Sequence, residues 1–124
     1  MVTRRRLTGD HFETLACLML EGHGLTCLAR NYLTRDGEVD LIMRDGRELV
    51  FVEVRYRASN RFGGAAASIT PAKRQRIVRA ARQFLATQRG YGGVVCRFDV
   101  VAYDGAASEP TSQWFRAAFE AGQR

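Results

Sequence analysis

This sequence lacks both long apolar runs and a cysteine framework. The longest apolar run near the N-terminus, Leu15 to Leu20, has six residues, too few for a membrane span or a signal-peptide core. The chain has three cysteines and two histidines, without a C-x-x-C pair, which argues against a disulfide framework and a zinc site. We therefore expect a cytoplasmic protein that has no membrane partner.

The chain is also too short for several domains. Its 124 residues bury roughly two-thirds of the unfolded surface, which suffices for one core. Hydrophobic residues make up 46% and charged residues 26%, close to the averages for globular proteins. The sequence therefore predicts a single domain over residues 1–124.

Acidic residues are absent from the whole stretch between Glu53 and Asp99. The net charge is +6, and arginine, which binds phosphate bidentately, supplies nearly all of the positive charge. This distribution favours a nucleic acid, and DNA in particular, as the partner. The alternative is a solvated basic surface with no partner. The cations of the acid-free stretch are Arg55, Arg57, Arg61, Lys73, Arg74, Arg76, Arg79, Arg82, Arg89 and Arg97.

Hydrophobic periodicity and turn residues predict an α-β-β-β-α-β order, an α/β fold with a mixed sheet. The segment Phe62 to Ser68 is expected to be a mobile loop, and the tail Trp114 to Phe119 fits either a strand or a helix. Thr70-Pro71 is a typical helix start, with threonine as the cap. The expected elements are a helix over 10–21, strands over 25–33, 38–43 and 48–56, a helix from Thr70-Pro71 to Gly90, and a strand over 94–103.

The pair Asp45-Gly46 between two alternating segments predicts a hairpin with a type I′ turn. If these two residues form the loop, Glu38 lies directly opposite Glu53. Glu53 is then also the diagonal neighbour of Asp40 on the same face of the sheet. A loop of another length would change this register. The opposite face is predicted to be an aliphatic layer of Val39, Leu41, Met43, Val50, Val52 and Val54.

Carboxylates gathered on one sheet face are unusual, because like charges across a strand pair destabilise it. A divalent cation would remove that repulsion, and Mg²⁺ prefers oxygen ligands while keeping several waters. Alternatively, Glu38 and Glu53 point into solvent or pair with Arg55 and Arg57. The spacing alone leaves both interpretations open.

Asp40, followed after twelve residues by Glu53-Val54-Arg55, resembles the PD-(D/E)xK nuclease motif, with arginine in the lysine position. The wider pattern resembles the bacterial YraN family, which is related to archaeal Holliday junction resolvases. The matching residues are Gly9-x-x-x-Glu13-x-x-Ala16, Arg30-Asn31, Gly37-Glu38-Val39-Asp40-Leu41-Ile42, Phe51-Val52-Glu53-Val54-Arg55, Lys73 and Arg97-Phe98-Asp99.

This resemblance implies a restriction-endonuclease-like α-β-β-β-α-β core with a mixed central sheet. It also implies a Mg²⁺ or Mn²⁺ site held by Asp40 and Glu53, with Glu13 as a further acidic ligand. These three residues and Arg55 are the expected catalytic residues. Glu13 has an alternative role, since its spacing from Asp10 fits a capping box. Arg55 stabilises charge but stays protonated, so it cannot serve as a general base.

Four cations near the carboxylate face are expected to contact phosphates: Arg57, Lys73, Arg76 and Arg97. Ordinary solvated charge is the alternative for each of them. Asp99 is expected to pair with Arg97 or with a backbone group and not to bind metal. Tyr56, Phe62 and Tyr91 are candidates for stacking on bases, although aromatic residues at such spacings also form cores.

The function expected from these features is Mg²⁺-dependent phosphodiester hydrolysis of structured or branched DNA. One alternative is an inactive nucleic-acid-binding module, and another is a protein-docking adaptor on the same fold. The adaptor could also dock a second copy of itself, and a two-fold homodimer would suit a symmetric branched substrate, because it presents two equivalent faces.

Overall fold

The computed structural model of the chain describes residues 4–59 and 61–121. In this part of the chain no helix combines the length and the apolar composition needed to cross a bilayer. The elements, in chain order, are α1 (Arg4–Gly22), β1 (Thr26–Leu33), β2 (Glu38–Asp45), β3 (Glu48–Arg57), the short 3₁₀ helix η1 (Arg61–Gly63), α2 (Gly64–Ala67), α3 (Pro71–Thr87), β4 (Cys96–Asp104) and β5 (Thr111–Phe119).

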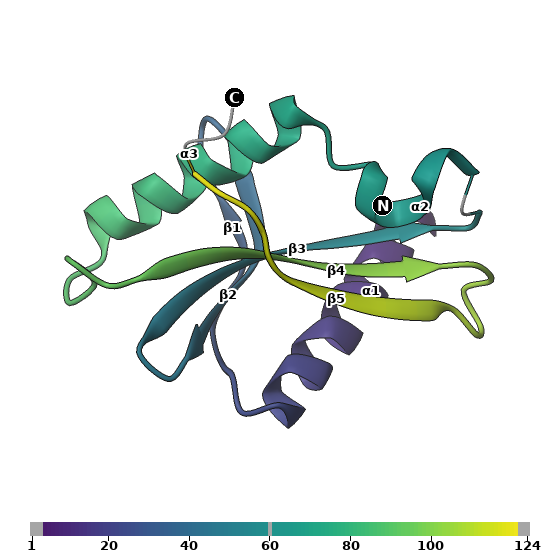
Figure 1. Cartoon of the computed structure of the whole chain (residues 1–124), viewed down its shortest axis with the longest axis horizontal. Helices are drawn as coiled ribbons and strands as arrows, with labels where there is room; N and C mark the ends of the chain where they lie inside the picture. The colour runs from purple at the N-terminus through teal and green to yellow at the C-terminus, as the bar shows by residue number, and fades with distance from the viewer. Residues whose placement is uncertain (1–3, 60, 122–124) are drawn as a thin grey trace.

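The strands form one mixed sheet in the order β1-β2-β3-β4-β5. Neighbours are antiparallel except β3 and β4, which are parallel. A parallel pair needs a crossover connection, and α3 supplies it. The helices α1 and α3 lie on opposite faces of the sheet (Figure 1). The expected α/β fold with a mixed sheet is confirmed, and the tail is a strand, β5.

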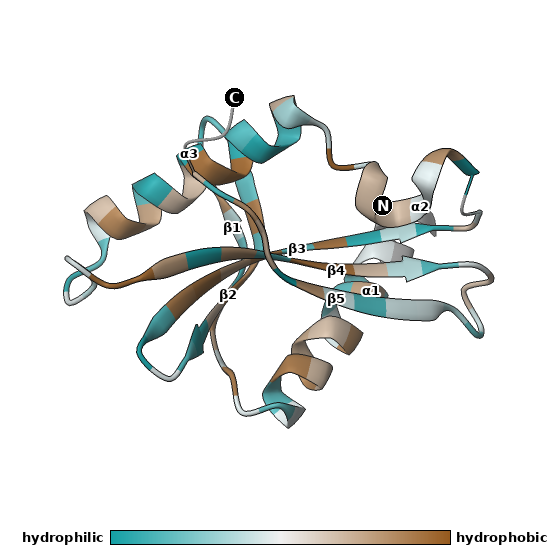
Figure 2. Ribbon diagram, in the orientation of Figure 1, coloured by the Kyte–Doolittle hydropathy of each residue, from teal (hydrophilic) through white to brown (hydrophobic). Residues whose placement is uncertain are grey.

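Two apolar layers enclose the sheet. Phe51, Phe84 and Phe98 belong to the layer beneath α3, whereas Phe12 and Val52 belong to the layer beneath α1. The middle of the sheet is accordingly brown in Figure 2, and α3 alternates between apolar and polar positions. Sequence alternation predicts this division, because successive residues of a strand point to opposite faces.

The expected start of α3 is confirmed. The Thr70 side chain accepts a hydrogen bond from the backbone N–H of Lys73, and Pro71 occupies the first turn. The expected loop over 62–68 is wrong, because most of this segment is helical, forming η1 and α2. The reason is a tertiary contact: the Asp104 carboxylate accepts the N–H of Ala65 at 2.7 Å and so holds the first turn of α2.

The expected hairpin register is also wrong. The two loop residues are Gly46 and Arg47, and Asp45 pairs with Glu48. Gly46 has a φ of 60° and Arg47 is not left-handed, which fits a type II′ turn and not a type I′ turn. The correct register is shifted by two residues, an even number, so the alternation of side chains between the two faces is kept. The expected opposition of Glu38 and Glu53 is therefore lost.

The start of β2 lies directly against α3. A Cβ at Gly37 would collide with the backbone carbonyl of Arg76, so glycine is required for this close approach. Val39, two residues further on, packs in the layer beneath α3. It was expected with Leu41 in the layer beneath α1, where Leu41 does lie.

Candidate active site

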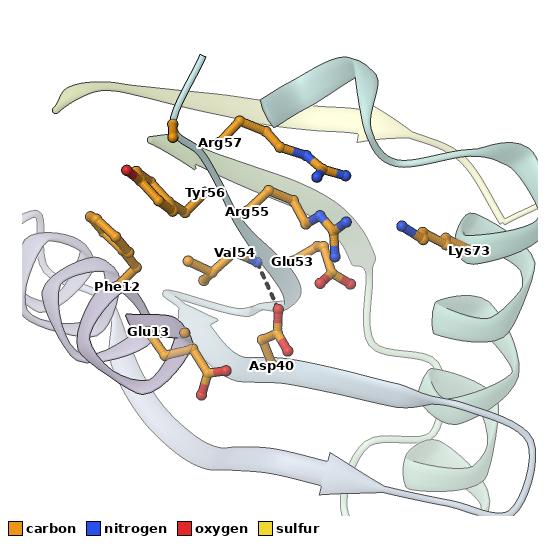
Figure 3. Close-up of a pocket in the computed structure, with 11 residues that line it drawn as sticks. Phe12, Glu13, Asp40, Glu53, Val54, Arg55, Tyr56, Arg57 and Lys73 are labelled. Atoms are coloured by element: carbon orange, nitrogen blue, oxygen red, sulfur yellow. Dashed lines mark hydrogen bonds between the residues drawn. The ribbon is translucent and has the colours of Figure 1, made fainter. Parts of the chain in front are cut away.

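A pocket of about 920 Å³ lies where α1, the C-terminal half of β3 and the start of α3 meet. One part of its wall is acidic and another part is basic, and Figure 3 shows the two kinds of side chain facing one space. The lining residues are Gly9, Phe12, Glu13, Asp40, Glu53, Val54, Arg55, Tyr56, Arg57, Ala58 and Lys73.

The register brings Asp40 and Glu53 together. Pairing between β2 and β3 runs up to Leu41 opposite Val52, so the next position along both strands places Asp40 opposite Glu53. There the backbone ladder is replaced by a side chain: Asp40 Oδ2 accepts the N–H of Val54 at 2.9 Å (Figure 3). This bond uses one oxygen of the Asp40 carboxylate and fixes the orientation of the other.

Glu53 is held in a setting that disfavours its charge. Burial raises the pKa of the Glu53 carboxyl well above its usual range, and hydrogen bonding to Asp40 and the negative charge of Asp40 raise it further. Arg55 acts in the opposite direction, and Glu38 adds to the increase. Two carboxylates this close compete for one proton unless a cation lies between them.

Glu13 approaches the same pair from α1. Burial raises the pKa of Glu13 to about 7, with further contributions from Asp40 and Asp10 and smaller opposing ones from Asn31 and Arg30. Its Oε1 atom is buried and has no hydrogen-bond partner. The capping-box alternative is wrong, because α1 begins at residue 4 and Asp10 lies inside the helix.

These residues fit a hard divalent cation. The three acidic side chains offer oxygen ligands, and the buried, unpartnered Oε1 of Glu13 is the kind of atom that a cation satisfies. Within the ranges that the structure describes, no group of three or more His, Cys, Asp or Glu side chains is arranged to hold a metal ion, so Glu13 does not complete a three-carboxylate site with Asp40 and Glu53. Mg²⁺ commonly takes only one or two carboxylates and retains waters. Asp40 and Glu53 would hold such an ion, with Glu13 beside them.

The basic wall consists of Arg55, Arg57 and Lys73. Arg55 Nε donates to Ser68 Oγ at 3.0 Å, and Lys73 Nζ donates to the Ser68 carbonyl oxygen at 3.4 Å. Burial, followed by the positive charges of Arg55 and Arg57, lowers the pKa of Lys73. Ser68 thus links the two cations, and Figure 3 shows them on the side of Glu53 away from Glu13.

Two expected phosphate contacts lie outside the pocket. Arg76 is exposed on α3 and does not line it. Arg97 lies near the hairpin end of the sheet and pairs with Asp45 at 2.9 Å, Glu48 at 2.7 Å and Asp99 at 3.1 Å. The expected pairing of Asp99 with Arg97 is confirmed, and three carboxylates already occupy the Arg97 guanidinium.

The strand β1, for which the sequence indicated no role, also shapes the site. Asn31 lies between the paired residues Arg30 and Tyr32, alongside Asp40 on β2, and has a φ of 52°. Its side chain lowers the pKa of Glu13. The Arg30 guanidinium donates to Thr14 Oγ1 at 2.9 Å and so ties β1 to α1. The sequence signal that could have indicated this left-handed position is an asparagine within a predicted strand, since asparagine is enriched in left-handed backbone.

The matching family model and the similar proteins all point to one family. The model of the family described as "Uncharacterised protein family UPF0102" matches residues 12–103. A UPF0102 protein of Klebsiella pneumoniae is 53% identical over 113 residues, which cover 90% of this chain and 85% of that protein. The UPF0102 protein YraN of Salmonella typhi is 51% identical over 116 residues, covering 93% and 86%. The matched region includes Glu13, Asp40, Glu53 and Lys73.

Proposed function

The chain belongs to the uncharacterised protein family UPF0102, and from this membership and the acidic pocket we propose that the protein is a Mg²⁺- or Mn²⁺-dependent endonuclease. Its reaction is hydrolysis of phosphodiester bonds in structured or branched DNA. Its core is of the restriction-endonuclease-like, PD-(D/E)xK kind. A DNA substrate also implies a cytoplasmic location.

The observation that supports this proposal most directly is that Asp40, Glu53 and Glu13, which come from three separate elements, line one pocket. Burial, followed by the neighbouring Asp40, raises the pKa values of Glu13 and Glu53, so the charged forms of these groups are held at an energetic cost. Strongly perturbed titratable groups in a cleft are typical of functional sites. The basic wall opposite offers a place for the phosphate backbone.

The division of the pocket into acidic and basic parts suits phosphodiester hydrolysis. When bound, a divalent ion at Asp40 and Glu53 supplies Lewis acidity and lowers the pKa of water. Asp40 is oriented by the N–H of Val54. Arg55 and Arg57 neutralise charge on the phosphate and its leaving oxygen, and fixed charges of this kind need no rearrangement during the reaction.

Arg55 cannot exchange a proton during the reaction, and Lys73 takes over part of this role. An arginine remains protonated throughout, whereas a lysine with a lowered pKa exchanges protons more readily. Lys73 is the only lysine of the chain and lines the pocket near Arg55. We infer that Lys73 orients the attacking water and that Arg55 contributes charge.

The test is a cleavage assay on labelled linear, single-stranded, flapped and four-way-junction DNA, with Mg²⁺, Mn²⁺ or EDTA. Metal-dependent product is expected from the native protein and from Glu109→Gln, a matched control at an exposed acid outside the pocket. Asp40→Asn and Glu53→Gln are expected to give no product while retaining DNA binding. Equal cleavage by all four proteins would refute the proposal.

A non-catalytic DNA-binding module is the second candidate, and Arg55 in the motif lysine position favours it. That module binds DNA in a salt-dependent manner and releases no product in any metal. Arg57→Gln is then expected to lower the slope of log affinity against log salt by about 0.9. A gel shift without product, in the same assay, would favour this candidate over the enzyme.

A further inference from the structure

The side chain of Phe62 is almost fully exposed to solvent, although a phenylalanine is usually buried. Its side chain is 98% exposed, compared with 75% for Leu33 and 64% for Val95. The alternative that Phe62 belongs to the core is therefore wrong. Its chain neighbours Arg61 and Gly63 are exposed and carry no apolar side chain.

The backbone conformation of residues 62–64 keeps the Phe62 side chain exposed. Phe62 has φ 57° and ψ 33°, a left-handed conformation that bulky residues rarely adopt. Gly63 and Gly64 follow with φ values of 88° and 75°. A Cβ at Gly64 would collide with the Asp104 carboxylate, which also accepts the N–H of Ala65. The strained turn is thus anchored to the end of β4.

The pocket lies close to this turn. Arg57 and Ala58 line the pocket, and Phe62 follows Ala58 by four residues, which span at most about 14 Å when fully extended. On either side of residue 60, Ser59 Oγ accepts the N–H of Arg61 at 3.2 Å. Phe62 and the basic wall are therefore within reach of one short strand of nucleic acid.

The charge near Phe62 favours a nucleic-acid strand as its ligand. The sequence from Val54 to Phe98 contains no acidic residue, and Arg55, Arg57 and Arg61 supply positive charge on this segment. The Asp104 carboxylate also lies against the turn, where it is engaged by the N–H of Ala65. An aromatic ring beside a cationic track is the arrangement that binds single strands, since every nucleobase has a face for stacking. A protein partner that docks on the ring would gain no apolar contact from the chain neighbours Arg61 and Gly63.

We propose that Phe62 stacks on an unpaired nucleobase of the strand whose phosphates lie in the pocket. The preferred substrate is accordingly single-stranded or locally unpaired nucleic acid, such as a flap, a gap or the centre of a junction. A base inside an intact duplex is already stacked on both sides and offers Phe62 no free face. This inference rests on the proposed function, because it requires the strand to pass through the pocket.

Binding without cleavage tests the inference. Fluorescence anisotropy in EDTA would compare single-stranded and duplex oligonucleotides for the native protein, Phe62→Ala and Phe62→Trp. Phe62→Ala is expected to weaken single-strand binding about tenfold, the usual effect of losing one base stack. Phe62→Ala should change the affinity for duplex less than twofold. Phe62→Trp should keep the native affinity for single strands. An oligonucleotide containing 2-aminopurine should report stacking through quenched emission, which Phe62→Ala abolishes.

Two exposed apolar residues away from the pocket provide matched controls. Leu33→Ala and Val95→Ala remove similar exposed side chains and are expected to leave both affinities unchanged. Phe62→Asn keeps a residue that tolerates the left-handed backbone, so it replaces Phe62→Ala if that variant fails to fold. Unchanged single-strand affinity in folded Phe62→Ala or Phe62→Asn would overturn the inference and leave the proposed function intact. A native protein that binds neither oligonucleotide would overturn both.

Discussion

One carboxylate oxygen of Asp40 accepts the backbone N–H of Val54 at 2.9 Å, so the acid on β2 is positioned by the residue that follows the acid on β3. Sites that must place ligands accurately gain from such support, because a fixed side chain loses little freedom when a ligand binds. The same bond also gives Asp40 a structural role that can be separated from its chemical role.

Asp40→Asn and Asp40→Ala are expected to separate these roles. The asparagine carbonyl still accepts the Val54 N–H, so Asp40→Asn should retain the native free energy of unfolding. Asp40→Ala leaves this buried donor unpaired and should cost about 1–3 kcal/mol. Urea unfolding measures both values. Under the proposed function, neither variant cleaves DNA, and an equally stable Asp40→Ala would show that the bond is structurally unimportant.

Glu53→Gln is expected to stabilise the protein without metal by about 1 kcal/mol, because it removes a poorly solvated charge next to Asp40. Saturating Mg²⁺ should raise the melting temperature of the native protein through preferential binding to the folded state. It should have little effect on Glu53→Gln. Calorimetry with and without EDTA measures both shifts, and Glu109→Gln, which should respond as the native protein does, is the control. A Mg²⁺ response that survives in Glu53→Gln would contradict this ligand assignment.

Stability in EDTA is expected to depend on pH through Glu13. Its pKa is raised from 4.5 to about 7 in the folded protein, so the folded state binds a proton that the unfolded state has released. The contribution of Glu13 to stability is therefore greatest below pH 4.5 and is lost as the pH rises to about 7. Urea unfolding at several pH values should show a smaller decline for Glu13→Gln than for the native protein. Parallel curves would argue that Glu13 is solvated.

Arg97 is expected to be a stability residue. Its ion pairs include the fully buried carboxylate of Asp99, which also accepts bonds from Trp114 Nε1 and the N–H of Ala117. Removing one partner of a buried pair typically costs about 3–5 kcal/mol. Arg97→Met should therefore lower the free energy of unfolding by a value near this range, without weakening DNA binding.

Urea unfolding and fluorescence anisotropy measure these two quantities. Arg89→Met, at an exposed arginine, is the control for loss of one positive charge and should change stability by less than about 0.5 kcal/mol. A stable Arg97→Met variant with weakened DNA binding would return Arg97 to the nucleic-acid interface.

Local signals in the sequence proved reliable for the fold. Thr70-Pro71 set the start of α3 because a cap and a proline act within one turn. The faces of the hairpin strands were predicted for all of the aliphatic layer except Val39, because a register error of two residues preserves alternation. The register itself depended on whether Asp45 or Gly46 opens the turn, and the sequence pair D-G fits both choices.

Features set by distant contacts were not predictable from the sequence. The helical turn at α2 depends on Asp104, which lies 39 positions beyond Ala65. The support that Asn31 gives Glu13 depends on a left-handed residue within β1. The direct opposition of Asp40 and Glu53 followed from the turn geometry, so the site was expected at the correct residues but with the wrong pairing.

The parallel pairing of β3 with β4 has a consequence for how the chain folds as it is made. Glu13, Asp40 and Glu53 all lie in the first half of the sequence, whereas β4 begins at Cys96. During translation the complete acid cluster leaves the ribosome while β3 still lacks a neighbour on one side. An unpaired apolar edge promotes aggregation. Chains that end before β4 should therefore precipitate, and rare codons between residues 57 and 96 should lower the soluble yield.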